Sequence, residues 1–188
     1  MNPALFHLAS GKVILRGFVN SDIPHLIKWY NDPEILNLTA ETEPLSQEKA
    51  RAFLRTIKTD KNRIWFMILD NATKTPIGEC GLLRIFRQWK TADLTMVIGE
   101  KRYWGKGHSH DAMRLLLDFA FTNLKLHRLS VGVLETNGRA IRFYKWFGFR
   151  EEGRQLDGYL SDGKYADFVM MSMIEDKHRQ GSNPNPVH

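Results

Sequence analysis

Short runs of apolar residues, separated by polar turns, recur along this chain. They are rich in Val, Ile, Leu and Phe, and several are too short for a helix, which favours β-strands. A turn at Asp70 and Asn71 separates two of the runs. The predicted strands are residues 12–18, 64–69, 76–86 and 94–98, residues 129–134, a strand region from Gly148, and a bent hairpin over residues 159–173 about Asp162 and Gly163.

Other segments place apolar residues three and four positions apart, as amphipathic helices do. The predicted helices carry residues 23–30, begin near Ser46, and cover residues 109–124 and 138–147. We expect a polar loop between Pro33 and Pro44. The order of elements predicts an α/β fold, with a mixed sheet of about seven strands and helices on both faces. Residues 1–177 are expected to form a single domain, and residues 178–188 a disordered tail.

Composition narrows the class of protein. With 188 residues, 43% of them hydrophobic and 26% charged, the chain has the make-up of a folded domain. A single cysteine, Cys80, cannot form an internal disulfide, and no secretory or membrane-spanning segment is evident, so a cytoplasmic location is expected. The net charge of +6 favours an anionic partner. Basic residues are not clustered, which disfavours nucleic acid and leaves a phosphorylated small molecule.

Residues 102–107, Arg-Tyr-Trp-Gly-Lys-Gly, lie between a predicted strand and the clearest predicted helix. Glycines there allow the backbone to approach a phosphate, which the N-terminus of the following helix also attracts. A Walker loop is excluded because Glu100 stands where its first glycine belongs and Gly107 replaces Ser or Thr. A dinucleotide fingerprint is excluded because His110 replaces its third glycine. A pyrophosphate cradle and an ordinary glycine turn remain open.

Three motifs together resemble the GNAT N-acetyltransferase superfamily. Arg102-x-x-Gly105-x-Gly107 resembles its acetyl-CoA pyrophosphate motif, and residues 137–149, Asn-x-x-Ala-x-x-Phe-Tyr-x-x-x-Gly-Phe, resemble the motif that follows. The ending, Gly158-Tyr159 with residues 162–167, is similar to the branch of ribosomal-protein and spermidine N-acetyltransferases. The resemblance covers roughly residues 12–175. It implies the GNAT fold and direct acetyl transfer from acetyl-CoA to a primary amine, without metal.

The resemblance also implies where acetyl-CoA binds. Its pantetheine arm would lie between the strands at residues 94–98 and 129–134, pairing with backbone groups of the first. The implied cofactor-binding residues are Met96, Val97, Ile98, Arg102, Gly105, Lys106, Gly107, His108, Ser109, Asn137 and Tyr144. His108 would lend an N–H to a phosphate, whereas Asn137 could equally be a simple helix cap.

Acetyl transfer needs a neutral amine, a stabilised oxyanion and a protonated leaving thiolate. Tyr144 matches the family's proton donor to the sulfur; the alternative is a tyrosine packed in the core. Candidate bases are Asp93 and Glu79, with Glu135 a further alternative, although water could relay the proton. A backbone N–H near Val97 would stabilise the oxyanion. Cys80 is expected to be a buried residue rather than a nucleophile, and the pair His108 and His110 lacks the further ligands that a metal needs.

Residues 32–48 contain five acidic residues and no lysine or arginine. They are either a solvated loop or a surface that attracts a cationic acceptor. In order, they match the connection that borders the acceptor groove in the family. The predicted substrate-binding residues are Trp29, Tyr30, Glu34 and Glu41, the two aromatic side chains serving as walls.

We expect a polyamine or a protein N-terminal amine as acceptor. An aminosugar-nucleotide or aminoglycoside acceptor is the alternative. A non-catalytic coenzyme A-binding or nucleic-acid-binding module is the alternative of another class, and self-association into a homodimer is left open.

Overall fold

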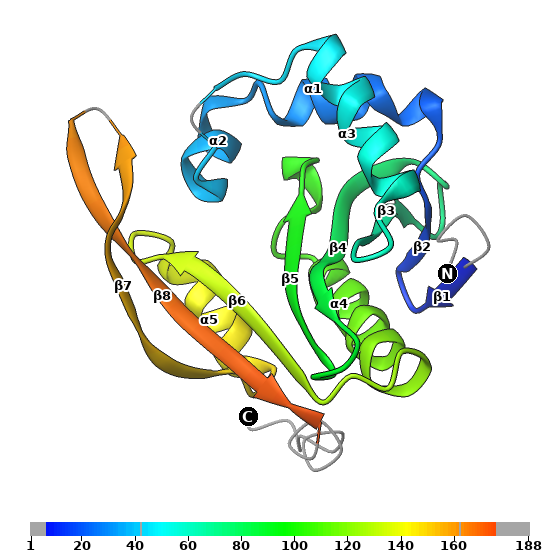
Figure 1. Cartoon of the computed structure of the whole chain (residues 1–188). Helices are drawn as coiled ribbons and strands as arrows, with labels where there is room; N and C mark the ends of the chain where they lie inside the picture. Colours follow the sequence, from blue (N-terminus) through cyan, green and yellow to red (C-terminus); the bar gives the residue numbers. More distant parts are fainter. Residues whose placement is uncertain (1–6, 42, 162, 176–188) are drawn as a thin grey trace.

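One mixed sheet organises the chain in the computed structural model, which describes residues 7–41, 43–161 and 163–175. The described strands form an eight-stranded sheet in the order β1-β2-β3-β4-β5-β6-β8-β7 (Figure 1). The strands are β1 His7–Ser10, β2 Val13–Gly17, β3 Ile64–Asp70, β4 Pro76–Phe86, β5 Thr91–Ile98, β6 Arg128–Leu134, β7 Arg150–Ser161 and β8 Lys164–Ile174. The expected disordered tail and the residue Asp162 lie outside the described residues.

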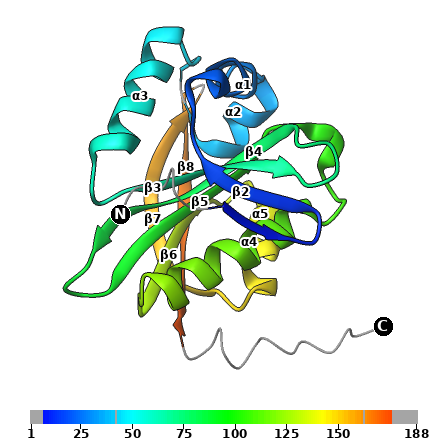
Figure 2. The same ribbon diagram turned by 90° about the vertical axis from the view of Figure 1, so that its right-hand side faces the viewer.

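Helices cover both faces of the sheet, as the sequence predicts, with α1 to α3 on one face and α4 and α5 on the other (Figure 2). The helices are α1 Ile23–Trp29, α2 Pro33–Thr39, α3 Gln47–Thr59, α4 His108–Asp118 and α5 Gly138–Trp146. No described helix is long and apolar enough to cross a membrane.

Strand β3 shows why the sheet is covered twice. Every residue of it is buried. Successive side chains of a strand point to opposite faces, so an uninterrupted apolar run supplies both. Ile64, Phe66 and Ile68 join the core under α4 and α5. Trp65, Met67 and Leu69 join the core under α1 to α3.

The sheet is divided between β5 and β6. These two strands are parallel and pair only where residues 91–93 of β5 face residues 128–130 of β6. Beyond that point β5 stays antiparallel to β4 and β6 stays antiparallel to β8. The gap that results opens toward α2 (Figure 1).

The structure corrects the predicted elements in three places. A short strand, β1, precedes the first predicted one and brings the described total to eight. The segment expected as a polar loop between Pro33 and Pro44 contains α2, because the Asp32 carboxylate accepts hydrogen bonds from the backbone N–H of Glu34 and Ile35 and caps that helix. The helix expected over residues 109–124 ends at Asp118 and continues as a π-helical turn, Phe119–Asn123.

Candidate active site

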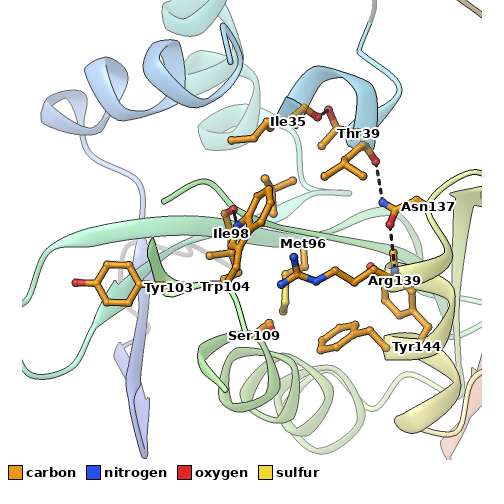
Figure 3. A pocket seen from close by; sticks show the side chains of 14 residues that line it. Ile35, Thr39, Met96, Ile98, Tyr103, Trp104, Ser109, Asn137, Arg139 and Tyr144 are labelled. Carbon is orange, nitrogen blue, oxygen red and sulfur yellow. Dashed lines mark hydrogen bonds between the residues drawn. The ribbon is translucent and has the colours of Figure 1, made fainter. Parts of the chain in front are cut away.

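Two connected cavities follow the division in the sheet. The first is lined by Ile35, Leu38, Thr39, Met96, Val97, Ile98, Tyr103, Trp104, Ser109, Asn137, Arg139, Ala140, Phe143 and Tyr144 (Figure 3). The second is lined by Tyr30, Leu38, Thr39, Ala40, Glu41, Asn137, Ala140, Tyr144, Phe168, residues 94–97 and residues 131–134. Seven residues line both, among them Met96, Val97 and Tyr144, so a molecule in one cavity can meet a molecule in the other at that place.

The glycine turn stands at the N-terminal end of α4. Gly105 and Gly107 have φ values of 71° and 86°, a conformation that glycine adopts without strain. A side chain at Gly105 would meet nothing within 4 Å, so this part of the turn is open. The Lys12 ammonium donates a hydrogen bond to the Lys106 carbonyl at 2.7 Å and fixes the glycine turn to the residue before β2.

The structure brings only part of the predicted cofactor site together. Ser109, Asn137, Tyr144 and residues 96–98 all line the first cavity. Arg102 and Lys106 are exposed and do not line it. His108 is buried, and its Nε2 lies 3.1 Å from Asp70 Oδ1, so this nitrogen faces the end of β3 rather than a phosphate. Its Nδ1 is buried and has no hydrogen-bond partner among the described residues, so the prediction that His108 lends an N–H to a phosphate stays a prediction for that nitrogen alone.

Asn137 occupies the junction of the two cavities with both of its polar atoms engaged. Its Oδ1 accepts a hydrogen bond from the Ala140 N–H at 3.0 Å and caps α5. Its Nδ2 donates to the Leu38 carbonyl at 3.1 Å, which links α5 to α2 across the gap (Figure 3). Asn137 is therefore a cap and a bridge.

Sequence analysis missed Arg139, the one charged side chain among the described residues that line the first cavity. Its guanidinium lies 4.9 Å from the centre of the Trp104 ring, and it forms no ion pair with any residue that the structure describes. Arg139 and Phe143 are one helical turn apart, as are Ala140 and Tyr144. This spacing could have identified the face of α5 that meets the cavity.

Tyr144 is the buried hydroxyl of the site, with 6% of its surface exposed. Its ring packs edge-on against Phe143 and Phe149. Burial, with a smaller contribution from Cys80, raises the pKa of Tyr144 above its usual value of 10.0. The phenol therefore keeps its proton at neutral pH.

Glu79 is a carboxylate in the middle of β4, with 2% of its surface exposed. One carboxylate oxygen accepts a hydrogen bond from the Tyr30 hydroxyl, and the other accepts from Trp65 Nε1 at 3.1 Å. Burial, assisted by the charge of Glu41, raises the pKa of Glu79 to about 7, although the two hydrogen bonds oppose the shift. Near neutral pH this group can accept or release a proton.

The other two candidate bases lie apart from this arrangement. Asp93 is in the segment where β5 still pairs with β6, and its carboxylate forms an ion pair with Arg84. Glu135 is exposed and lies 2.9 Å from the Arg154 guanidinium. Neither lines either cavity. Glu79 also lines neither cavity, but its carboxylate accepts a hydrogen bond from Tyr30, which lines the second cavity, and this link favours Glu79 among the three.

The predicted acceptor residues are also divided. Tyr30 and Glu41 line the second cavity. Trp29 is 1% exposed and its Nε1 donates to Glu100 Oε1 at 3.0 Å, so the prediction that it forms a wall of the site is wrong. Glu34 is 2.8 Å from the Lys101 ammonium, which also pairs with Asp32, so these two acids of the segment are already engaged in ion pairs.

Comparison with known proteins identifies the architecture. The GNAT acetyltransferase domain family matches residues 12–150. The chain belongs to this family. The GNAT resemblance predicted from the glycine turn and the Asn137 motif is thereby confirmed, and the protein is an N-acetyltransferase.

Individual relatives agree with this assignment. The uncharacterized N-acetyltransferase p20 of Bacillus licheniformis is 25% identical over 174 residues, which cover 91% of this chain and 97% of that protein. The spermidine N(1)-acetyltransferase of Vibrio cholerae is 29% identical over 111 residues, 59% of this chain and 64% of that one.

The fold is also that of a solved structure. A spermidine N-acetyltransferase from Vibrio cholerae, crystallised in complex with CoA and spermine, superposes with a TM-score of 0.83 at 24% identity, covering 90% of this chain and 99% of that one.

Proposed function

We propose that this GNAT enzyme transfers the acetyl group of acetyl-CoA to a cationic primary amine, either a polyamine or a protein N-terminal amine. The observation that carries the proposal is the separation of β5 from β6 beside Tyr144. It leaves one edge of β5 without a partner strand next to the two connected cavities. An extended molecule with amide groups can pair with such an edge. We further propose a cytoplasmic location, which the single cysteine favours.

The first cavity suits the donor. Acetyl-CoA would supply an activated thioester on a long arm that ends in a pyrophosphate. Met96 and Val97 would border the arm, and the open glycine turn would receive the pyrophosphate at the start of α4. Arg139, a cation without a carboxylate partner among the described residues, adds the opposite charge. The residues present therefore fit this donor.

The chemistry follows from the two ionisable groups. Tyr144, protonated at neutral pH, donates its proton to the leaving thiolate. Glu79, with a pKa of about 7, receives the proton that the amine must lose in order to attack. A backbone N–H near Val97 stabilises the oxyanion that forms between these steps.

The second cavity suits a cationic acceptor. Glu41 lies on its lining and offers a carboxylate to a cation there. Tyr30 offers an aromatic wall to an ammonium group. The relatives named for spermidine acetylation, from Vibrio cholerae and from Escherichia coli at 29% identity each, support a polyamine.

Release of free thiol from acetyl-CoA tests the proposal. The assay would compare polyamines and N-terminal peptides with aminosugar nucleotides and aminoglycosides. We expect thiol release that depends on the amine and is fastest with one of the first two groups. Fastest release with an aminosugar or an aminoglycoside would contradict the acceptor assignment, and thiol release independent of any amine would contradict amine transfer.

A further inference from the structure

Glu79 has no direct access to the acceptor. It is 2% exposed and belongs to the lining of neither cavity. The two oxygens of its carboxylate face the Tyr30 hydroxyl and Trp65 Nε1. An amine in the second cavity therefore cannot touch the group that, under the proposed function, receives its proton.

Tyr30 lies between the buried Glu79 carboxylate and the second cavity. It is the residue at which α1 ends, it lines the second cavity together with Tyr144, and its hydroxyl donates to Glu79. A phenol oxygen that donates its own hydrogen can still accept another. The Tyr30 oxygen is thus bonded to the buried carboxylate while its residue forms part of the cavity lining.

We propose that Tyr30 is a catalytic residue that carries the proton from the acceptor amine to Glu79. The substrate ammonium gives an N–H proton to Tyr30 Oη as the phenol gives its own proton to Glu79 Oε1. One N–H bond and one O–H bond break, and two O–H bonds form. The result is a neutral amine, an unchanged phenol and a protonated Glu79. This inference rests on the proposed function.

The surroundings of Tyr30 require the two transfers to occur together. Burial, followed by the negative charges of Glu79 and Glu41, raises the pKa of Tyr30 well above its usual value of 10.0. A free phenolate is therefore not formed. Glu41 and Glu79 are the charged groups that act on Tyr30, and both disfavour a negative charge on its oxygen.

The test is Tyr30→Phe, which keeps the ring and removes the relay, with Tyr165→Phe as control because that exposed tyrosine belongs to neither cavity. The acceptors are a series of alkyl amines made progressively less basic by fluorine substitution. We expect Tyr30→Phe to lower kcat for the most basic amine about 100-fold, and progressively less for amines that are already neutral in solution. A tyrosine that only shaped the cavity would give the same loss across the series.

The factor by which kcat falls is compared across amines for one variant, so a partly unfolded preparation lowers every value equally and does not alter the trend. Equal loss for all amines, or no loss, would overturn the relay. Combining Tyr30→Phe with Glu79→Gln gives a second measure, because two members of one relay should lose little more together than the more damaging change alone. Independent, multiplying losses would contradict it.

Failure of the relay and failure of the proposed function are distinguishable. If the unaltered protein releases thiol with amines and Tyr30→Phe does so equally well, only the relay is overturned. If the unaltered protein shows no amine-dependent release, both are overturned.

Discussion

The environment of Glu79 sets the pH at which the site can work. Because a base acts only when unprotonated, we expect kcat/KM to rise with pH through about 7 and then level off. Glu79→Gln should remove this rise and slow turnover about 100-fold or more. A pH–rate profile of both proteins measures it. Glu135→Gln is the matched control, because Glu135 is exposed and pairs with Arg154 rather than with Tyr30, and it should keep the rise.

The same pKa affects stability in the opposite sense. The unfolded chain ionises Glu79 around its usual value of 4.5, whereas the folded protein holds the proton until about 7. The contribution of Glu79 to the free energy of unfolding is therefore greatest below 4.5 and is lost as the pH rises toward 7. Catalysis gains its base over the range in which the fold loses that contribution.

Tyr144 gives a second prediction at the scale of one residue. Tyr144→Phe keeps the buried ring and removes the proton donor. We expect unchanged affinity for CoA and a loss of about 100-fold or more in kcat. Calorimetric titration and steady-state rates measure the two quantities. A variant with the original kcat would eliminate the acid role.

Single residues were the hardest part of the site to predict. His108 and Trp29 stand beside or within the expected motifs, yet both turn inward to carboxylates distant in sequence, Asp70 and Glu100. Such partners come from tertiary packing, which no local pattern encodes. Glu79 could be named from its residue type, but its isolation from the cavity could not. Arg139, which the family motif does not include, could have been predicted from its helical spacing to Phe143.

At the scale of elements, substitutions in the glycine turn can distinguish the effect of backbone strain from the effect of a lost ligand contact. Gly105→Asp introduces a side chain at positive φ, which costs about 1 kcal/mol of stability, and a negative charge facing the expected pyrophosphate. We expect weaker CoA binding in a calorimetric titration. Gly163→Asp is the matched control because Gly163 has a φ of 72° and equally open space, but lies in the turn between β7 and β8. Equal CoA affinity for the two variants would remove the turn from the donor site.

The end of β5 depends on a different glycine. A side chain at Gly99 would lie 2.1 Å from the Trp29 ring, so Gly99→Ala forces α1 away from the sheet. We expect a loss of about 1–3 kcal/mol in the free energy of unfolding, measured by denaturant titration. Gly153→Ala, where a side chain meets nothing within 4 Å, should cost much less. Similar losses would mean that Trp29 is not held tightly at this contact.

Helices and strands with a regular spacing of hydrophobic residues were predicted well, whereas a helix defined by its capping residue was not. The alternating partition of β3 between two cores and the apolar face of α4 follow from hydrophobic spacing alone. Helix α2 has only seven residues, begins with Pro33 and is followed by Pro44, so the two prolines favoured a loop. Asp32 before Pro33 was the available signal, since an acidic cap followed by proline is a common start of a helix.

At the scale of the whole molecule, the two motifs predicted the family because they occupy opposite sides of one feature. The glycine turn follows β5, and the Asn137 motif follows β6. Each motif alone is weak evidence for the family. The two together are strong evidence, because this fold brings both motifs to the same gap. The identity of the acceptor is not encoded in this way, because Tyr30 and Glu41 come from a segment whose other acids, Asp32 and Glu34, serve as ion-pair partners.

The division in the sheet also bears on how the molecule avoids aggregation. An unpaired strand edge normally invites a strand from another chain. Here two such edges lie inside the sheet, and the hydrogen bond from Asn137 to Leu38 holds α2 and α5 together across the gap. A β-strand from another chain would have to break that hydrogen bond, whereas the narrower pantetheine arm of the proposed donor could enter beneath it. The bridge thus lets the protein keep an incomplete sheet without offering it to its neighbours.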